Sequence, residues 1–191
     1  MKTKFDNQGV VAAWARQNQY EGYNARGSLF FRDRTIYSYG GHFPIAKFVA
    51  NAKGERAILL TTRGYSVTTS AHVARVREEA GYTGLPVFLV HNPAESGKDA
   101  AKDLLDYAKK VSEAIGKAAR ARSEWRRESW TRDAVELAKE ARDFARFFGL
   151  PAEIKAPEDA VEVYASYLHA QVAEGRSTHS QVMAELARIC A

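Results

Sequence analysis

The chain has 191 residues, a formal net charge of +5 and globular proportions of hydrophobic (46%) and charged (27%) residues. A chain of this length can bury a core without staples, and its single cysteine, Cys190, excludes an internal disulfide and a metal site built from several thiolates. The amino-terminal residues lack the apolar run of a signal peptide, and no apolar stretch approaches the ~20 residues that span a bilayer, so we expect a cytoplasmic protein without a membrane partner.

The first predicted element is a helix over residues 7–17. Asp6 or Asn7 has the side chain of a helix N-cap. Residues 18–28 are polar and contain two glycines, which predicts a loop before the first strand. Four apolar residues at helical spacing form the predicted buried face of the helix: Val10, Val11, Trp14 and Ala15.

A β-region follows, beginning with a tight hairpin. Residues 28–31 and 35–39 are rich in aromatic and β-branched side chains and flank a short charged turn. Residues 43–49 and 56–62 are two further strand candidates, separated by a turn sequence that contains glycine. Residues 86–91 predict a last strand, which an Asn-Pro pair ends.

One more helix is predicted before that last strand. A hydroxyl residue at positions 68–70 can cap it, so that it runs from about residue 71 to residue 80 and closes at Gly81. Residues 1–95 therefore predict an α+β module. We expect an antiparallel or mixed sheet of four or five strands, on which this helix packs.

The remaining residues, 96–191, carry helical patterns throughout and predict an all-helical second half. Two apolar stripes run through residues 97–148 one position out of phase, so this stretch is either one long helix or a helical hairpin. Gly149 ends it. Residues 157–174 and the residues from Ser177 onward predict two shorter helices.

Positive charge is concentrated in two places. Residues 1–96 hold 12 basic and 7 acidic side chains, whereas residues 97–191 hold 16 of each. Within residues 117–132, six basic side chains accompany two acidic ones, and two tryptophans lie among them. Such a segment can bind a phosphate backbone, with tryptophans stacking on bases; the alternative is a solvated helix face that pairs with the acidic residues after 132. The candidate binding residues are Arg120, Arg122, Arg126 and Arg127.

Two further segments, 36–46 (IYSYGGHFPIA) and 65–72 (YSVTTSAH), place tyrosines, hydroxyls and one histidine beside a strand end. Functional groups are often displayed there, and the start of a helix offers N–H groups to an anion. His42 and His72 are candidate acid and base groups if they approach one another. The structural alternative is that the tyrosines pack a sheet and the hydroxyls cap a helix. The candidate binding residues are Tyr37, Tyr39, Tyr65, Thr68 and Thr69.

The sequence contains none of the motifs GxGxxG, P-loop, GxSxG or HExxH. Its five histidines are scattered and no acidic residue stands at ligand spacing beside them. We therefore predict no metal and no cofactor. Whether the protein is an enzyme stays open, and the absence of a carboxylate in either histidine segment favours a non-enzymatic protein.

The paired segments resemble a family of uncharacterised proteins of bacteriophages and other mobile elements. The similarity covers about residues 8–80, and Trp14 and the Asn24-Ala25-Arg26 run belong to it. It implies action inside a bacterial host cell, and it assigns no catalytic residues. The helical half matches no family in this way.

Three functions follow as hypotheses. The first is an accessory protein that binds nucleic acid or a host nucleoprotein complex, including a counter-defence protein of the anti-CRISPR type. The second is a small enzyme that acts on a nucleotide or RNA phosphate through His42 and His72. The third is a helical interaction module that pairs with itself, as a homodimer, or with a host protein through residues 97–191.

Overall fold

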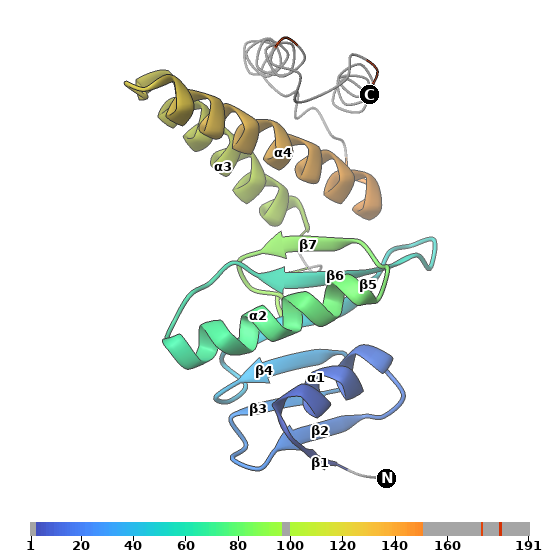
Figure 1. Cartoon of the computed structure of the whole chain (residues 1–191). Coiled ribbons are helices and arrows are strands. Elements are labelled where there is room, and N and C mark those ends of the chain that lie inside the picture. Colours follow the sequence, from blue (N-terminus) through green and yellow to red (C-terminus); the bar gives the residue numbers. More distant parts are fainter. Residues whose placement is uncertain (1–2, 97–99, 151–172, 174–179, 181–191) are drawn as a thin grey trace. The chain divides into compact units, whose positions relative to one another are not determined.

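The computed structural model describes residues 3–96 and 100–150, together with residues 173 and 180 (Figure 1). The chain divides into two compact units, Met1–Asp103 and Leu104–Ala191. The class is α+β: a mixed sheet with two helices forms the first unit, and two long helices follow it. The two shorter helices predicted after residue 156 lie outside the described residues.

The sheet has seven strands in sequential order, so each strand lies beside its neighbours in the chain. The first pair, β1 and β2, is parallel and is joined through helix α1. The last pair, β6 and β7, is parallel and is joined through helix α2. The bounds are β1 Lys4–Phe5, α1 Asn7–Arg16, β2 Glu21–Asn24, β3 Leu29–Arg32, β4 Thr35–Ser38, β5 Pro44–Ala50, β6 Arg56–Thr61, α2 Val67–Tyr82 and β7 Val87–Val90.

All strand pairs between β2 and β6 are antiparallel. Strands β2, β4 and β6 therefore point the same way, and β1 and β7 point with them. The β1–α1–β2 and β6–α2–β7 connections both move across the sheet in the same direction. Connections of this kind share one handedness, so both helices are expected on the same face of the sheet. Helices α1 and α2 do lie on the same face and contact each other (Figure 1).

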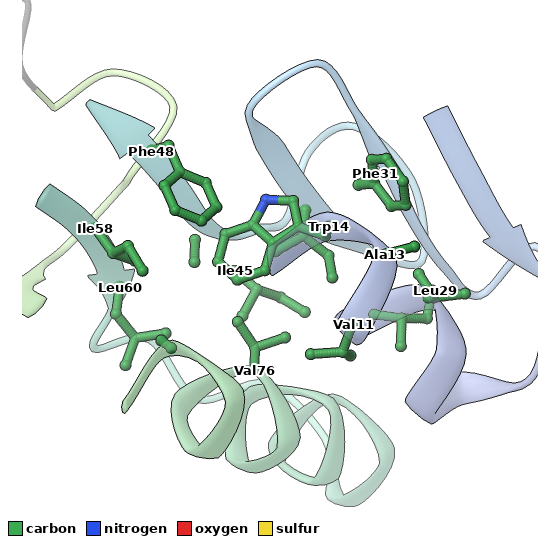
Figure 2. Packing of buried hydrophobic residues seen from close by; sticks show 14 of the residues in the cluster. Val11, Ala13, Trp14, Leu29, Phe31, Ile45, Phe48, Ile58, Leu60 and Val76 are labelled. Atoms are coloured by element: carbon green, nitrogen blue, oxygen red, sulfur yellow. The ribbon is translucent and has the colours of Figure 1, made fainter. Parts of the chain in front are cut away.

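The core of this unit lies between the sheet and its two helices, with Trp14 at its centre (Figure 2). Trp14 is fully buried, its ring centroid lies 4.7 Å from that of Phe48, and its indole N–H donates to the carbonyl of Arg34 at 3.0 Å. Val11 of α1 and Val76 of α2 enter the same core. The predicted stripe of the first helix is confirmed, except that Ala15 is only partly buried.

The sheet is larger than the four or five strands we predicted, because β1 and β2 have no local strand signature. The segment Glu21–Asn24 lies in the predicted loop, and it contains a glycine and an asparagine, which are poor strand formers. It is held by pairing on both sides, with β1 and with β3. The hairpin, the two strands after it and the last strand are confirmed within one or two residues.

Both helix starts in this unit are capped by side chains. Asp6 accepts a hydrogen bond from the Gly9 amide at 2.7 Å, as its sequence position predicts. Helix α2 starts earlier than predicted, at Val67, and its cap is Ser66, whose hydroxyl accepts from the Thr69 amide at 3.2 Å. The predicted start near residue 71 was wrong because a serine at 66 caps as well as the hydroxyls at 68–70.

Residues 97–148 contain two helices, α3 (Ala100–Arg120) and α4 (Glu124–Phe148). They are antiparallel neighbours: the rings of Tyr107 and Phe144 lie 5.5 Å apart, and Val111 packs with Ala138. The Tyr107 hydroxyl donates to a carboxylate oxygen of Glu140 at 2.7 Å. Gly149 ends α4 in the left-handed conformation, at φ 66°, which confirms the predicted stop.

Candidate functional site

The topology brings the two tyrosine- and histidine-containing segments to one edge of the sheet. Strands β4 and β6 point the same way, because β5 lies between them and is antiparallel to both. The turn after β4, residues 39–43, and the connection after β6, residues 62–66, therefore start from the same end of the sheet. We call their joint surface the strand-end surface.

One link between the segments is buried. The hydroxyl of Ser38, at the end of β4, lies 2.9 Å from Nδ1 of His72 in α2, and both residues are almost completely buried. The Tyr39 ring lies beside this pair, with its centroid 6.0 Å from that of His72. Tyr39 has φ 52°, which is uncommon for a residue other than glycine, and Gly40 follows it at φ 108°.

The second link lies nearer the surface. The guanidinium of Arg63 stands over the Phe43 ring, 4.6 Å from its centroid, and Nη2 of Arg63 donates to the carbonyl of His42 at 3.3 Å. The Tyr65 ring lies 6.1 Å from that of Phe43 and is 79% exposed. Phe43 is buried, and both the Arg63 guanidinium and the exposed Tyr65 ring lie against its ring.

The two histidines have different surroundings. His42 is exposed in the turn before β5, whereas His72 is 1% exposed. Burial, and to a lesser extent the positive charge of Arg75, lowers the pKa of His72 below its ordinary value of 6.5. The buried imidazole is hydrogen-bonded to Ser38 and so connects α2 with the end of β4. The acid–base role of the two histidines stays a prediction.

The predicted binding residues of these segments divide between surface and interior. Tyr39 and Tyr65 are exposed at the strand-end surface, and Thr68 is exposed in the first turn of α2. Thr69 is buried, and its hydroxyl accepts a hydrogen bond from that of Ser66 at 3.1 Å. Tyr37 stacks on Phe30 across the β3–β4 pair, with 5.2 Å between the ring centroids, so it packs the sheet.

The basic segment of the second unit forms the elbow between α3 and α4. An open hollow of about 460 Å³ lies there. Arg127 does not line it; its Nη2 donates to the carbonyl of Ala121 at 3.5 Å. Lys117 does line it, with its Nζ 4.5 Å from the centroid of the Trp130 ring. The lining residues are Lys117, Arg120, Ala121, Arg122, Arg126 and Trp130.

A second hollow, of about 390 Å³, continues along the hairpin on the other side of Trp130. It shares Lys117 with the elbow, but four of its lining residues are acidic: Glu113, Asp133, Glu136 and Glu140. The surface therefore changes sign at Trp130. In the described part of the chain, no group of three or more histidine, cysteine or acidic residues is placed to hold a metal ion.

No family model, curated protein or solved structure matches this chain. Among residues 3–96 and 100–150, no helix has both the length and the apolar composition needed to cross a membrane.

Sequence reasoning missed two residues of these surfaces. Arg63 lies between Thr62 and Gly64, and its partners, Phe43 and His42, lie about twenty positions earlier. No local pattern could have found it. Lys117 was within the basic segment, and the antiparallel return of α4 places it beside Trp130.

Proposed function

We propose that the elbow between α3 and α4 binds the phosphates of a nucleic acid. The observation that carries this proposal is the lining of the elbow hollow, where four cationic side chains and one indole surround about 460 Å³ and no acidic side chain takes part. A concave basic surface attracts polyanions, and releasing their condensed counterions drives binding. Residues 117–132, with six basic and two acidic side chains, supply the charge.

The competing fate of these arginines is pairing with acidic residues of α4. Asp143 instead pairs with Arg146 at 3.3 Å, and Glu140 accepts from the Tyr107 hydroxyl. Among the described residues, Arg122 and Arg126 form no ion pair. Within the described part of the chain, no acidic partner therefore neutralises their charge.

Two tryptophans extend the proposal from phosphates to bases. Trp125 is 74% exposed, and Trp130 lines the hollow beneath Lys117. Base stacking on an indole contributes ~1–3 kcal/mol and does not depend strongly on sequence. The elbow therefore fits a single-stranded or partly unpaired nucleic acid better than a perfect duplex, in which base faces are covered.

The biological role follows from this surface together with the resemblance of residues 8–80. The proposal is an accessory protein of a phage or mobile element that acts on nucleic acid or on a host nucleoprotein complex. The counter-defence role, including the anti-CRISPR type, is part of the same proposal and rests on the resemblance alone.

The test is a fluorescence-anisotropy titration of labelled single-stranded and duplex DNA and RNA, repeated at rising salt. The variant Arg122→Ala/Arg126→Ala removes two charges from the hollow. The matched control, Lys109→Ala/Arg146→Ala, removes the same charge from exposed positions of α3 and α4 outside the hollow. The elbow variant should bind at least about tenfold more weakly at low salt, with a salt slope lower by up to about two units.

Each variant should be checked by circular dichroism, because Arg122 is exposed in the turn between the helices and Arg126 is exposed on α4, so alanine at these positions should leave the helical content unchanged. Absence of binding by the wild-type chain to all four nucleic acids at low salt would contradict the proposal. Equal losses in the elbow variant and in the control would contradict the elbow as the site, since net charge alone would then explain the binding.

A further inference from the structure

Arg63 has more hydrogen-bonding capacity than its surroundings use. A guanidinium carries five N–H donors. One of them reaches the His42 carbonyl, whereas Nε is buried and has no hydrogen-bond partner among the described residues. A buried donor without a partner costs free energy, and a bound water or ion is one explanation of such a group in a native protein.

Two tyrosines of the strand-end surface are exposed, and a flat ligand can stack on an exposed ring. Tyr65 lies against the Phe43 ring, as Arg63 does, and is 79% exposed. Tyr39, on the neighbouring turn, is 52% exposed above His72. Exposed tyrosine rings beside an arginine are the elements with which proteins stack bases and hold the adjoining phosphate.

The local charge is also suited to an anion. Neither residues 34–54 nor residues 61–72 contain an aspartate or a glutamate. The first turn of α2 starts at Val67, three residues after Gly64, and the amides of its first turn lie at the positive end of the helix dipole. Ser66 already occupies the Thr69 amide, so the amides of Val67 and Thr68 are the ones left for a ligand.

We propose that the strand-end surface binds a nucleotide unit, with its phosphate on Arg63 and its base stacked on Tyr65. The nucleotide is either a free mononucleotide or one unit of a single strand, since both present the same base and phosphate. This site lies in the first unit, so it does not depend on nucleic-acid binding at the elbow.

The experiment uses the full chain carrying Arg122→Ala/Arg126→Ala, which weakens binding at the elbow. Adenosine monophosphate, adenosine and inorganic phosphate are titrated separately while ¹H–¹⁵N spectra are recorded. Adenosine monophosphate should shift the Arg63 Nε–H signal and the amides of Val67 and Thr68. Adenosine and inorganic phosphate should each bind at least about tenfold more weakly, because each makes only half of the contacts.

Substitutions separate the two contacts. Arg63→Gln and Tyr65→Leu should each weaken adenosine monophosphate about tenfold, the loss expected for one charged hydrogen bond or one stacked ring. Arg77→Gln and Tyr82→Leu are the matched controls, because both residues are exposed on α2 away from its first turn, and they should change nothing. A ten-nucleotide oligothymidylate distinguishes the two sources: tighter binding than the mononucleotide assigns a strand, and equal binding assigns a free nucleotide.

Two results would overturn the proposal. One is the absence of shifts at Arg63, Val67 and Thr68 with adenosine monophosphate. The other is equal affinity for the nucleotide and inorganic phosphate, together with no effect of Tyr65→Leu. The shifts at Arg63, Val67 and Thr68 report the first unit, and the elbow is weakened in this chain. Failure here therefore leaves the elbow proposal untouched, and failure of the elbow proposal leaves these shifts interpretable.

Discussion

The Ser38 hydroxyl and Nδ1 of His72 lie 2.9 Å apart in the interior, and this bond ties the end of β4 to helix α2. It joins two segments 34 positions apart in sequence. The strand-end surface adjoins this pair, because Tyr39 follows Ser38 directly and its ring lies beside the His72 imidazole. The properties of the pair should therefore be visible in the stability of the first unit.

The first prediction concerns pH. The pKa of His72 is lowered in the folded chain, mainly by burial and then by Arg75, whereas the unfolded chain titrates near 6.5. As pH falls, the unfolded state binds the proton first, so stability is complete above about pH 7.5, falls below pH 6.5 by up to ~1.4 kcal/mol per pH unit, and levels off below the folded pKa. His72→Gln should remove this slope.

Urea unfolding at several pH values measures this pH dependence of the unfolding free energy. Trp125→Phe/Trp130→Phe leaves Trp14 as the only tryptophan, and Trp14 reports the first unit. His42→Gln is the control, because His42 is exposed and should leave the slope unchanged. A slope that survives His72→Gln would show that other groups cause it.

The second prediction concerns Trp14. Trp14→Phe removes the hydrogen bond to the Arg34 carbonyl and leaves space beside Phe48, so it should cost about 2–3 kcal/mol of unfolding free energy. The Arg34 carbonyl keeps a second donor, the Phe48 amide at 3.1 Å, which limits the loss. Trp125→Phe is the matched change at a 74% exposed site and should stay within about 0.5 kcal/mol. Calorimetry measures both variants, and equal losses of unfolding free energy in Trp14→Phe and Trp125→Phe would contradict the central position of Trp14 in the core.

Local signals explain what could be predicted from the sequence. The Asp6 cap, the β3–β4 hairpin and the Gly149 stop each depend on neighbouring residues, and each is confirmed. Strand β2 was missed because its stability comes from pairing with β1 and β3, which no window around Glu21–Asn24 contains. The link through Arg63 was missed for the same physical reason, since its partners come from another strand end.

The third prediction follows from the close packing of β2. A Cβ added at Gly22 would lie 2.6 Å from the Phe31 ring and 3.1 Å from the Phe5 ring. Gly22→Ala should therefore destabilise the first unit by about 1–3 kcal/mol, the usual cost of overpacking. Thermal melts measure this loss of stability. Gly41→Ala is the control, because nothing lies within 4 Å of a Cβ added at Gly41. The double variant Gly22→Ala/Phe31→Leu should lose less than the sum of its parts, and strict additivity would count against this clash.

The last prediction distinguishes the arginines of the elbow from one another. Arg122 and Arg126 line the hollow, whereas Arg127 bonds to the Ala121 carbonyl and does not. Arg122→Ala/Arg126→Ala should lower the salt slope of nucleic-acid binding by up to about two units, because each lost phosphate contact removes about 0.7–0.9. Arg126→Ala/Arg127→Ala, with the same change in net charge, should lower it by only about one unit. Salt titrations with one labelled single strand compare the two variants directly. If the two slopes fall equally, the segment acts as a diffuse basic patch, and the hollow does not define the contact.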